Sequence, residues 1–338
     1  GKRRLEAATR ILLAMTLWLT PLVLLVLSML RVYSRQVASR LLLGAFVSSL
    51  AGGAVALWFA FMLPAYEAER LFNSSIFQMD ISSIVHVLTS YWQSDNRSTV
   101  HPLRPLLLQP IAYLVSSLTN IGGEVRICQI TSAVCLSLSI ALLTVALYGF
   151  TKKWSAVIIG VSGYIFSFSY LLFSTFPESA GLATPTVILP YAIYSLYINH
   201  ERVSRSERLL HYSAGVLSFG VTITNLIHSL IVYSFRIAKT SSRRGSKRKS
   251  VTIVLQYVVI TLLLTICLSF VQRILYPGSP YWFHPVSLLR EGVWLAIWWD
   301  GYLHPLRTLL QVLVYPILGT SPVLSSLGMR LERIPNPM

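Results

Sequence analysis

The chain has 338 residues, of which 54% are hydrophobic and only 12% are charged, and its mean hydropathy is +0.63. A soluble globular domain usually carries about twice that share of charged residues, so the composition excludes an ordinary soluble enzyme and indicates a polytopic membrane protein. The formal net charge of +16 would suit nucleic-acid binding if the cations formed one patch. They instead occupy short linkers between apolar segments, so no nucleic-acid partner is expected.

The apolar segments have lengths near or above the roughly 20 residues that a helix needs to cross a bilayer. In chain order they are 11–30, 41–63, 127–150, 155–175, 182–198 and 251–272, with a more interrupted segment at 211–235. Helices are expected because lipid offers no partner for unpaired backbone groups. The sequence thus predicts an all-α membrane bundle in three parts: an extra hydrophobic segment and basic linker (1–40), a membrane module with a long external loop at 64–126 (41–275), and an aromatic-rich outer and C-terminal region (276–338).

The basic residues predict which end of the bundle faces the cytoplasm. Fifteen of the 28 Lys and Arg fall in the linkers 31–40, 151–154, 199–210 and 236–250, which the positive-inside rule places in the cytoplasm. Eight of the twelve acidic residues lie in the segments left for the other face: Glu67, Glu69, Asp80, Asp95, Glu124, Glu178, Glu291 and Asp300. One face is therefore poor in cations and rich in carboxylates.

Two segments must not cross the membrane if this charge pattern holds. The segment 103–119 is short, carries Arg104 and contains Pro105 and Pro110, so we expect a helix that lies at the outer interface or dips into it. The segment 211–235 separates two strongly basic linkers, which predicts a helical hairpin that goes part of the way into the membrane, breaks near 219–225 and returns. A plain span that violates the charge rule is the open alternative.

The amino-terminal segment fits the rule less well. If 41–63 runs outward, then 11–30 runs inward and leaves Lys2, Arg3, Arg4 and Arg10 outside. Either this segment is not a full crossing or the rule fails there. The three cysteines, Cys128, Cys135 and Cys267, lie inside predicted spans without metal-ligand spacing, and no cluster of His and carboxylate residues predicts a metal site.

The stretch "FQMDISSIVHVLTSYWQSDNRSTVHPLRPLLLQP" (77–110) follows an outward span and gathers scarce charged residues. With an aspartate early in the first external loop (Asp80), a histidine-proline start to the returning helix (100–110), "FPES" (176–179) and the break "GVTITN" (220–225), the chain resembles the GT-C superfamily of integral-membrane glycosyltransferases over roughly residues 41–275. The loop departs from that family because Asp80 is followed only at a distance by a second acid, Asp95.

The resemblance implies a GT-C-like bundle that moves a sugar from a polyprenyl-phosphate donor to an acceptor on the noncytoplasmic face of a bacterial plasma membrane or endoplasmic reticulum. Asp80 would be the base that deprotonates the acceptor, with Glu178 orienting the acceptor or supporting Asp80. His101 and Arg104 would hold the lipid phosphate in a cationic or metal-assisted environment. The remaining substrate contacts are assigned to Asp95, Asn225 and His228.

Each assignment has a structural alternative. Asp80 would cap a helix, His101 would begin one, and Arg104 would extend toward lipid headgroups. Glu178 would be a solvated turn residue, and His228 would be a hydrogen-bonded interior histidine. At the level of function, the alternatives are a noncatalytic subunit of a larger membrane assembly, which would have membrane-protein partners, and a transporter with a broken-helix site.

Overall fold

The computed structural model describes residues 2–62, 81–89, 101–119, 123–176, 179–242 and 247–276, and every regular element within these ranges is a helix. The elements are α1 (Lys2–Val32), α2 (Arg35–Met62), α4 (Ile81–Thr89), α5 (Arg104–Thr119), α6 (Glu124–Thr151), α7 (Trp154–Ile165), α8 (Phe168–Thr175), α9 (Ser179–Tyr197), α10 (Arg205–Val221), the 3-10 helix η1 (Ile223–Asn225), α11 (Leu226–Ser242) and α12 (Lys247–Leu275).

Several of these helices are long and apolar enough to cross a membrane. In the described part of the chain they are α1 from Ala8 onward, α2, α6 and the Ser250–Leu275 part of α12. The predicted span at 155–175 is not one straight helix, because it bends by 50° between α7 and α8. Ser167 caps the second piece by accepting a hydrogen bond from the backbone N–H of Tyr170. The bent pair would make a fifth crossing, which is consistent with a multi-pass membrane protein.

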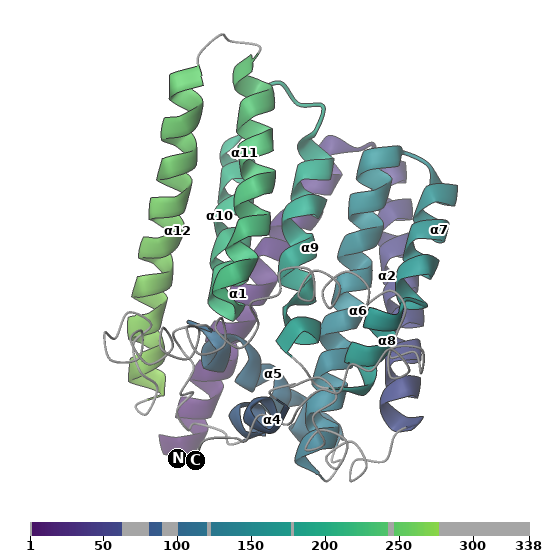
Figure 1. Ribbon diagram of the computed structural model, residues 1–338, viewed down its shortest axis with the longest axis vertical. Helices are drawn as coiled ribbons and strands as arrows, with labels where there is room; N and C mark the ends of the chain where they lie inside the picture. Colours follow the sequence, from purple (N-terminus) through teal and green to yellow (C-terminus); the bar gives the residue numbers. More distant parts are fainter. Residues whose placement is uncertain are drawn as a thin grey trace, which may run out of the picture.

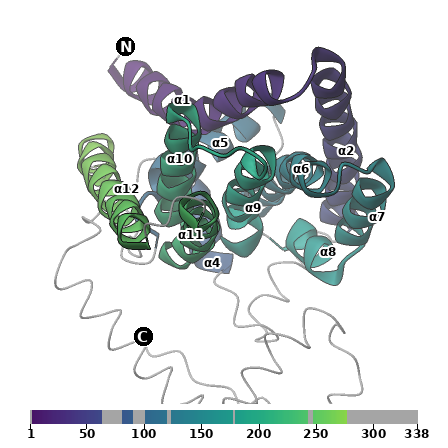
Figure 2. The same ribbon diagram turned by 90° about the horizontal axis from the view of Figure 1, so that it is seen from above.

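Helix α6 forms the centre of the bundle, packed between α2 and α9 (Figures 1 and 2). Helix α12 lies at the outer edge against α10 and α11. Small hydroxyl residues join the central helices: Ser137 Oγ donates to the Ser49 carbonyl oxygen at 2.8 Å, and the two hydroxyls are 2.9 Å apart. Such contacts hold membrane helices together where lipid removes the hydrophobic drive for association.

The turns that carry the basic linkers all lie at one end of the bundle. Figure 1 shows the α1–α2, α6–α7 and α9–α10 connections at its upper end, where α11 also ends and α12 begins, and we call this the basic end. Helices α2 and α12 finish at the opposite end, where α6 begins and where α4 and α5 lie. The grouping of the basic linkers on one face is therefore confirmed for the elements that flank them.

The helical break and return predicted between the last two basic linkers are confirmed, while the depth to which the hairpin enters a membrane stays a prediction. Helix α10 leaves the basic end and stops at Val221, and α11 returns to that end beside it. The chain turns at Thr222, whose backbone is extended with φ −155° and ψ 128°. Because both helices have 17 residues, each is about 25 Å long at 1.5 Å per residue. We call the turn at residues 220–225, together with residues 101–104 that pack on it, the hairpin tip.

Helix α5 packs among other helices of the bundle. The side chains from Leu103 to Pro110 are all buried, and α5 packs on α1, α4, α6 and α10. The indole N–H of Trp18 donates to the Leu107 carbonyl oxygen at 3.1 Å, and Gln109 Nε2 donates to the Val87 carbonyl oxygen at 2.6 Å. The first half of α5 is therefore enclosed by other helices, which supply partners for its polar groups, while its depth relative to a membrane interface stays a prediction.

Helix α1 is long and apolar enough for a full crossing, so the alternative of a segment too short to cross is not supported. Helix α1 runs from the opposite end up to the basic end (Figure 1), so its first residues lie away from the basic linkers. Arg10 is buried there, with its guanidinium carbon 4.8 Å from the centre of the Tyr276 ring. This cation–π contact ties α1 to the residue that follows α12.

Candidate functional site

Four of the seven predicted site residues lie within the described ranges, and all four are at or beside the hairpin tip. They are His101, Arg104, Asn225 and His228. Asp80, Asp95 and Glu178 lie outside the described residues, so their convergence with the others stays a prediction. In sequence, Asp80 directly precedes α4 and Glu178 directly precedes α9.

The start of α5 closes the end of α10. His101 Nδ1 lies 2.8 Å from the Val221 carbonyl oxygen and 3.1 Å from Thr222 Oγ1, and the backbone N–H of Leu103 donates to the Gly220 carbonyl oxygen at 2.7 Å. The last carbonyls of any helix lack partners within it, so these contacts satisfy two of them. His101 is therefore an interior histidine that fixes α5 to the hairpin tip, with Nδ1 carrying the proton toward Val221.

The contact between α5 and the hairpin tip is close because residue 220 is a glycine. A β-carbon at Gly220 would lie 2.8 Å from Leu103 Cδ1 and 3.1 Å from Leu103 Cβ. Contacts under 3 Å force a shift of the neighbour. Gly220, which lies within the predicted break at 219–225, thus makes room for α5.

Arg104 occupies the first turn of α5 and is 1% exposed. Its side chain is enclosed by protein, whereas an interfacial arginine usually extends past the protein surface to lipid headgroups. A guanidinium keeps its charge at any physiological pH, and a charge removed from water needs hydrogen-bonding or anionic groups around it. The protein thus holds a permanent cation inside the bundle at the hairpin tip.

Gln272, near the end of α12, completes the framework around the start of α5. Its Nε2 donates to the Pro102 carbonyl oxygen at 3.0 Å, and its Oε1 accepts from the backbone N–H of Leu106 at 3.3 Å. The sequence analysis missed this residue. In the sequence, Gln272 stands three residues after Ser269 and seven after Thr265 in a largely apolar segment, which places the three polar side chains on one helical face. The structure buries all three.

Asn225 and His228 face α9 and contact different partners from His101. Asn225 Nδ2 lies 3.5 Å from Thr186 Oγ1, and the Tyr191 hydroxyl lies 3.2 Å from His228 Nδ1. Both predicted residues are partly exposed. All four described residues therefore lie in one region at the hairpin tip. His101 and Arg104 lie at the start of α5, whereas Asn225 and His228 contact residues of α9.

A buried ion pair that the sequence analysis did not predict holds the base of the hairpin. Glu207 and Arg236 are both fully buried, and Arg236 Nε donates to Glu207 Oε1. Arg236 also donates to the carbonyl oxygens of His200 and Arg202, at 2.8 and 3.3 Å. Ser204 and Glu207 form a capping box at the start of α10. The pair thus joins α10, α11 and the preceding linker.

The turns at the basic end are tied together by Lys152. Its ammonium donates to the Tyr33 hydroxyl at 2.6 Å and lies 4.6 Å from the centre of that ring. Partial burial disfavours the charged ammonium and lowers the pKa of Lys152. Burial is also the largest reason why the pKa of Tyr33 is raised to about 12. This contact links the α1–α2 turn to the α6–α7 turn.

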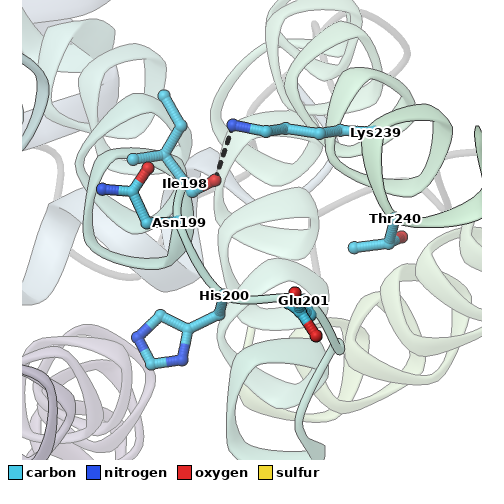
Figure 3. A pocket seen from close by; sticks show the side chains of 6 residues that line it. All are labelled: Ile198, Asn199, His200, Glu201, Lys239 and Thr240. Atoms are coloured by element: carbon cyan, nitrogen blue, oxygen red, sulfur yellow. Dashed lines mark hydrogen bonds between the residues drawn. The ribbon is translucent and has the colours of Figure 1, made fainter. Parts of the chain in front are cut away.

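A small pocket lies at the basic end and not at the hairpin tip. It is lined by Ile198, Asn199, His200, Glu201, Lys239 and Thr240 (Figure 3). Lys239 Nζ crosses its mouth and donates to the Ile198 carbonyl oxygen at 2.7 Å. The pocket has room for about one water molecule, so it does not accommodate a sugar.

Comparisons with known proteins give no further assignment. No family model matches the chain, and neither curated proteins nor solved structures give a match. Within the described ranges, no three His, Cys, Asp or Glu side chains are grouped so that they would hold a metal ion.

Proposed function

We propose that the protein is a membrane glycosyltransferase that moves a sugar from a polyprenyl-phosphate donor to an acceptor on the noncytoplasmic face. The observation that carries the proposal is the buried cation Arg104 beside His101, at the start of α5 and against the break between α10 and α11. The GT-C resemblance assigns the same two residues to the lipid phosphate.

The depth of this site supports a lipid phosphate as its ligand. Helix α10 begins at the basic end, so its far end lies about 25 Å away along the helix, whereas the hydrocarbon core of a bilayer is about 30 Å thick. The hairpin tip is therefore near the headgroup level of the opposite leaflet. A polyprenyl phosphate anchored in that leaflet carries its charge at this level, where Arg104 would make a charge-assisted contact.

The acidic residues would supply the chemistry. Asp80 would take the proton from the acceptor nucleophile as it attacks the anomeric carbon of the donor sugar, while the bond from that carbon to the phosphate oxygen breaks. The departing polyprenyl phosphate would be stabilised by Arg104. Glu178 would orient the acceptor, and Asp95, Asn225 and His228 would contact the substrates.

The test is sugar transfer from several polyprenyl-phosphate sugars by the purified full chain. Asp80→Asn should keep the fold and lipid binding while reducing the rate by about 100-fold or more, because a general base acts in the transition state. Arg104→Lys should weaken donor binding, since Lys keeps the charge but loses the planar fork of donors. Glu201→Gln, an exposed acid at the basic end, is the matched control and should retain activity.

The outcomes separate the candidates. Equal rates for wild type and Asp80→Asn would remove Asp80 as the base. No transfer by wild type from any donor would instead favour the noncatalytic subunit. Transport of a solute without sugar transfer would favour the third candidate, which is supported by the broken helix at the hairpin tip.

A further inference from the structure

Helix α12 carries a stripe of buried polar side chains from Tyr257 to Gln272. Tyr257, Thr261, Thr265, Ser269 and Gln272 are each at most 1% exposed, and their spacing of three or four residues places them on one helical face. The opposite face is apolar, with Leu255 and Leu263 more than half exposed. The lower end of the stripe holds α5 through Gln272, and its upper end faces the hairpin.

At the upper end, side chains from three helices form a polar cluster. The His211 ring from α10 lies 4.9 Å from the Tyr233 ring of α11, which lies 4.5 Å from the Tyr257 ring of α12. The Tyr257 hydroxyl donates to the His211 carbonyl oxygen at 3.2 Å and is hydrogen bonded to Ser229 Oγ. We call these residues, with Thr261, the three-helix cluster.

Several polar atoms of this cluster have no hydrogen-bond partner among the residues that the structure describes. They are both ring nitrogens of His211, the Tyr233 hydroxyl and Thr261 Oγ1, and all three residues are 0% exposed. A neutral imidazole has one donor and one acceptor in either tautomer, and each hydroxyl has both. Each such group left without a hydrogen bond would lower the equilibrium constant for folding by roughly tenfold or more.

Gly215 lets α12 pack closely against α10 beside these atoms. A β-carbon there would lie 2.4 Å from the Tyr257 hydroxyl and 3.0 Å from Thr261 Oγ1. The two hydroxyls from α12 therefore approach the backbone of α10 where it has no side chain. Because His211 is one turn earlier on the same helix, the unpartnered groups of α10 and α12 lie along a common line of contact.

We propose that the three-helix cluster binds a buried water molecule that bridges His211, Tyr233 and Thr261. A buried water typically makes two to four hydrogen bonds with groups of this kind. A cation is disfavoured, since Arg236 lies close by and the carboxylate of Glu207 is already paired with it. An apolar ligand would leave the same four atoms unpartnered. This site does not depend on the proposed transferase activity.

The test uses solid-state NMR of the full chain in lipid bilayers with ¹⁵N-labelled histidine. The His211 signals are assigned as those missing from His211→Gln, and magnetisation transfer from water to the His211 ring is measured in the wild type. The bridging water predicts efficient transfer to this fully buried ring. Absence of transfer in the wild type would overturn the proposal.

A matched pair of variants locates the water. Thr261→Val removes an unpartnered hydroxyl with little change of shape, and it should lower the transfer rate at His211 several-fold. Thr265→Val removes a hydroxyl that already donates to the Thr261 carbonyl oxygen at 2.9 Å, and it should leave the rate unchanged. Equal rates in Thr261→Val and wild type would also contradict a water bridging these two residues.

Discussion

At the scale of single residues, the buried pair Glu207 and Arg236 makes the sharpest stability prediction. Glu207→Gln leaves the Arg236 guanidinium buried without its counter-charge, and breaking such a pair costs about 3–5 kcal/mol. The thermal midpoint of the purified protein in detergent should fall clearly. Arg208→Gln, which changes an exposed neighbouring charge, should stay within about 0.5 kcal/mol of wild type.

A double variant separates the lost charge balance from general damage. Glu207→Gln combined with Arg236→Gln removes both charges, so it should be less destabilised than the sum of the two single variants. If Glu207→Gln behaves like Arg208→Gln, the pair contributes nothing to stability. If the double variant is simply additive, the two side chains do not act together.

The sequence identified some of these residues and missed others for a physical reason. His101 and Arg104 stand out as polar side chains at the start of an apolar helix, and the structure buries both. Glu207 and Arg236 are separated by 29 residues, and the capping pattern around Ser204 indicates only the helix start. Pairing across that distance depends on how α10 and α11 pack, which local sequence patterns do not specify.

At the scale of helices, the fit of α5 against the hairpin tip is testable through Gly220. Gly220→Ala places a methyl group 2.8 Å from Leu103 Cδ1, and overpacking of this kind costs about 1–3 kcal/mol. We expect a lower thermal midpoint in detergent. The predicted transferase activity should also fall, because the start of α5 carries His101 and Arg104.

The matched control is Gly163→Ala in α7. A β-carbon at Gly163 has no neighbour within 4 Å, and alanine favours the helix over glycine by about 1 kcal/mol. This variant should be as stable as wild type or more so. A Gly220→Ala protein as stable as Gly163→Ala would show that Leu103 adjusts freely and that the close contact has no energetic role.

Charge parity predicted the hairpin, since two basic linkers on one face require an even number of passes between them. Charge parity did not predict that other helices surround the start of α5. An apolar helix with prolines has the same sequence pattern whether lipid or protein surrounds it. The bend between α7 and α8 was missed for a similar reason. The segment 155–175 is almost uniformly apolar, and only Ser167 signals a new helix start.

At the scale of the whole molecule, the arrangement of the basic linkers predicts the membrane orientation. Ser34 and Ser206 lie in or next to the α1–α2 and α9–α10 turns at the basic end, whereas Thr119 lies near the start of α6 at the other end. Single cysteines at Ser34 and Ser206 should react with a membrane-impermeant reagent from the cytoplasmic side. A cysteine at Thr119 should react from the opposite side.

The background for this experiment replaces Cys267, which is exposed on α12, and retains the buried Cys128 and Cys135. Labelling of Ser34 and Ser206 from opposite sides would contradict the bundle itself, because both turns lie at one end of it. Labelling of both from the noncytoplasmic side would keep the bundle but invert it. This inversion is costly under the positive-inside rule. It would move the fifteen Lys and Arg residues of the four basic linkers to the noncytoplasmic side, while the four cations at the start of α1 would become cytoplasmic. A cytoplasmic Ser34 and Ser206 with an external Thr119 would put the hairpin tip, with Arg104, near the outer headgroups, where a lipid phosphate is within reach.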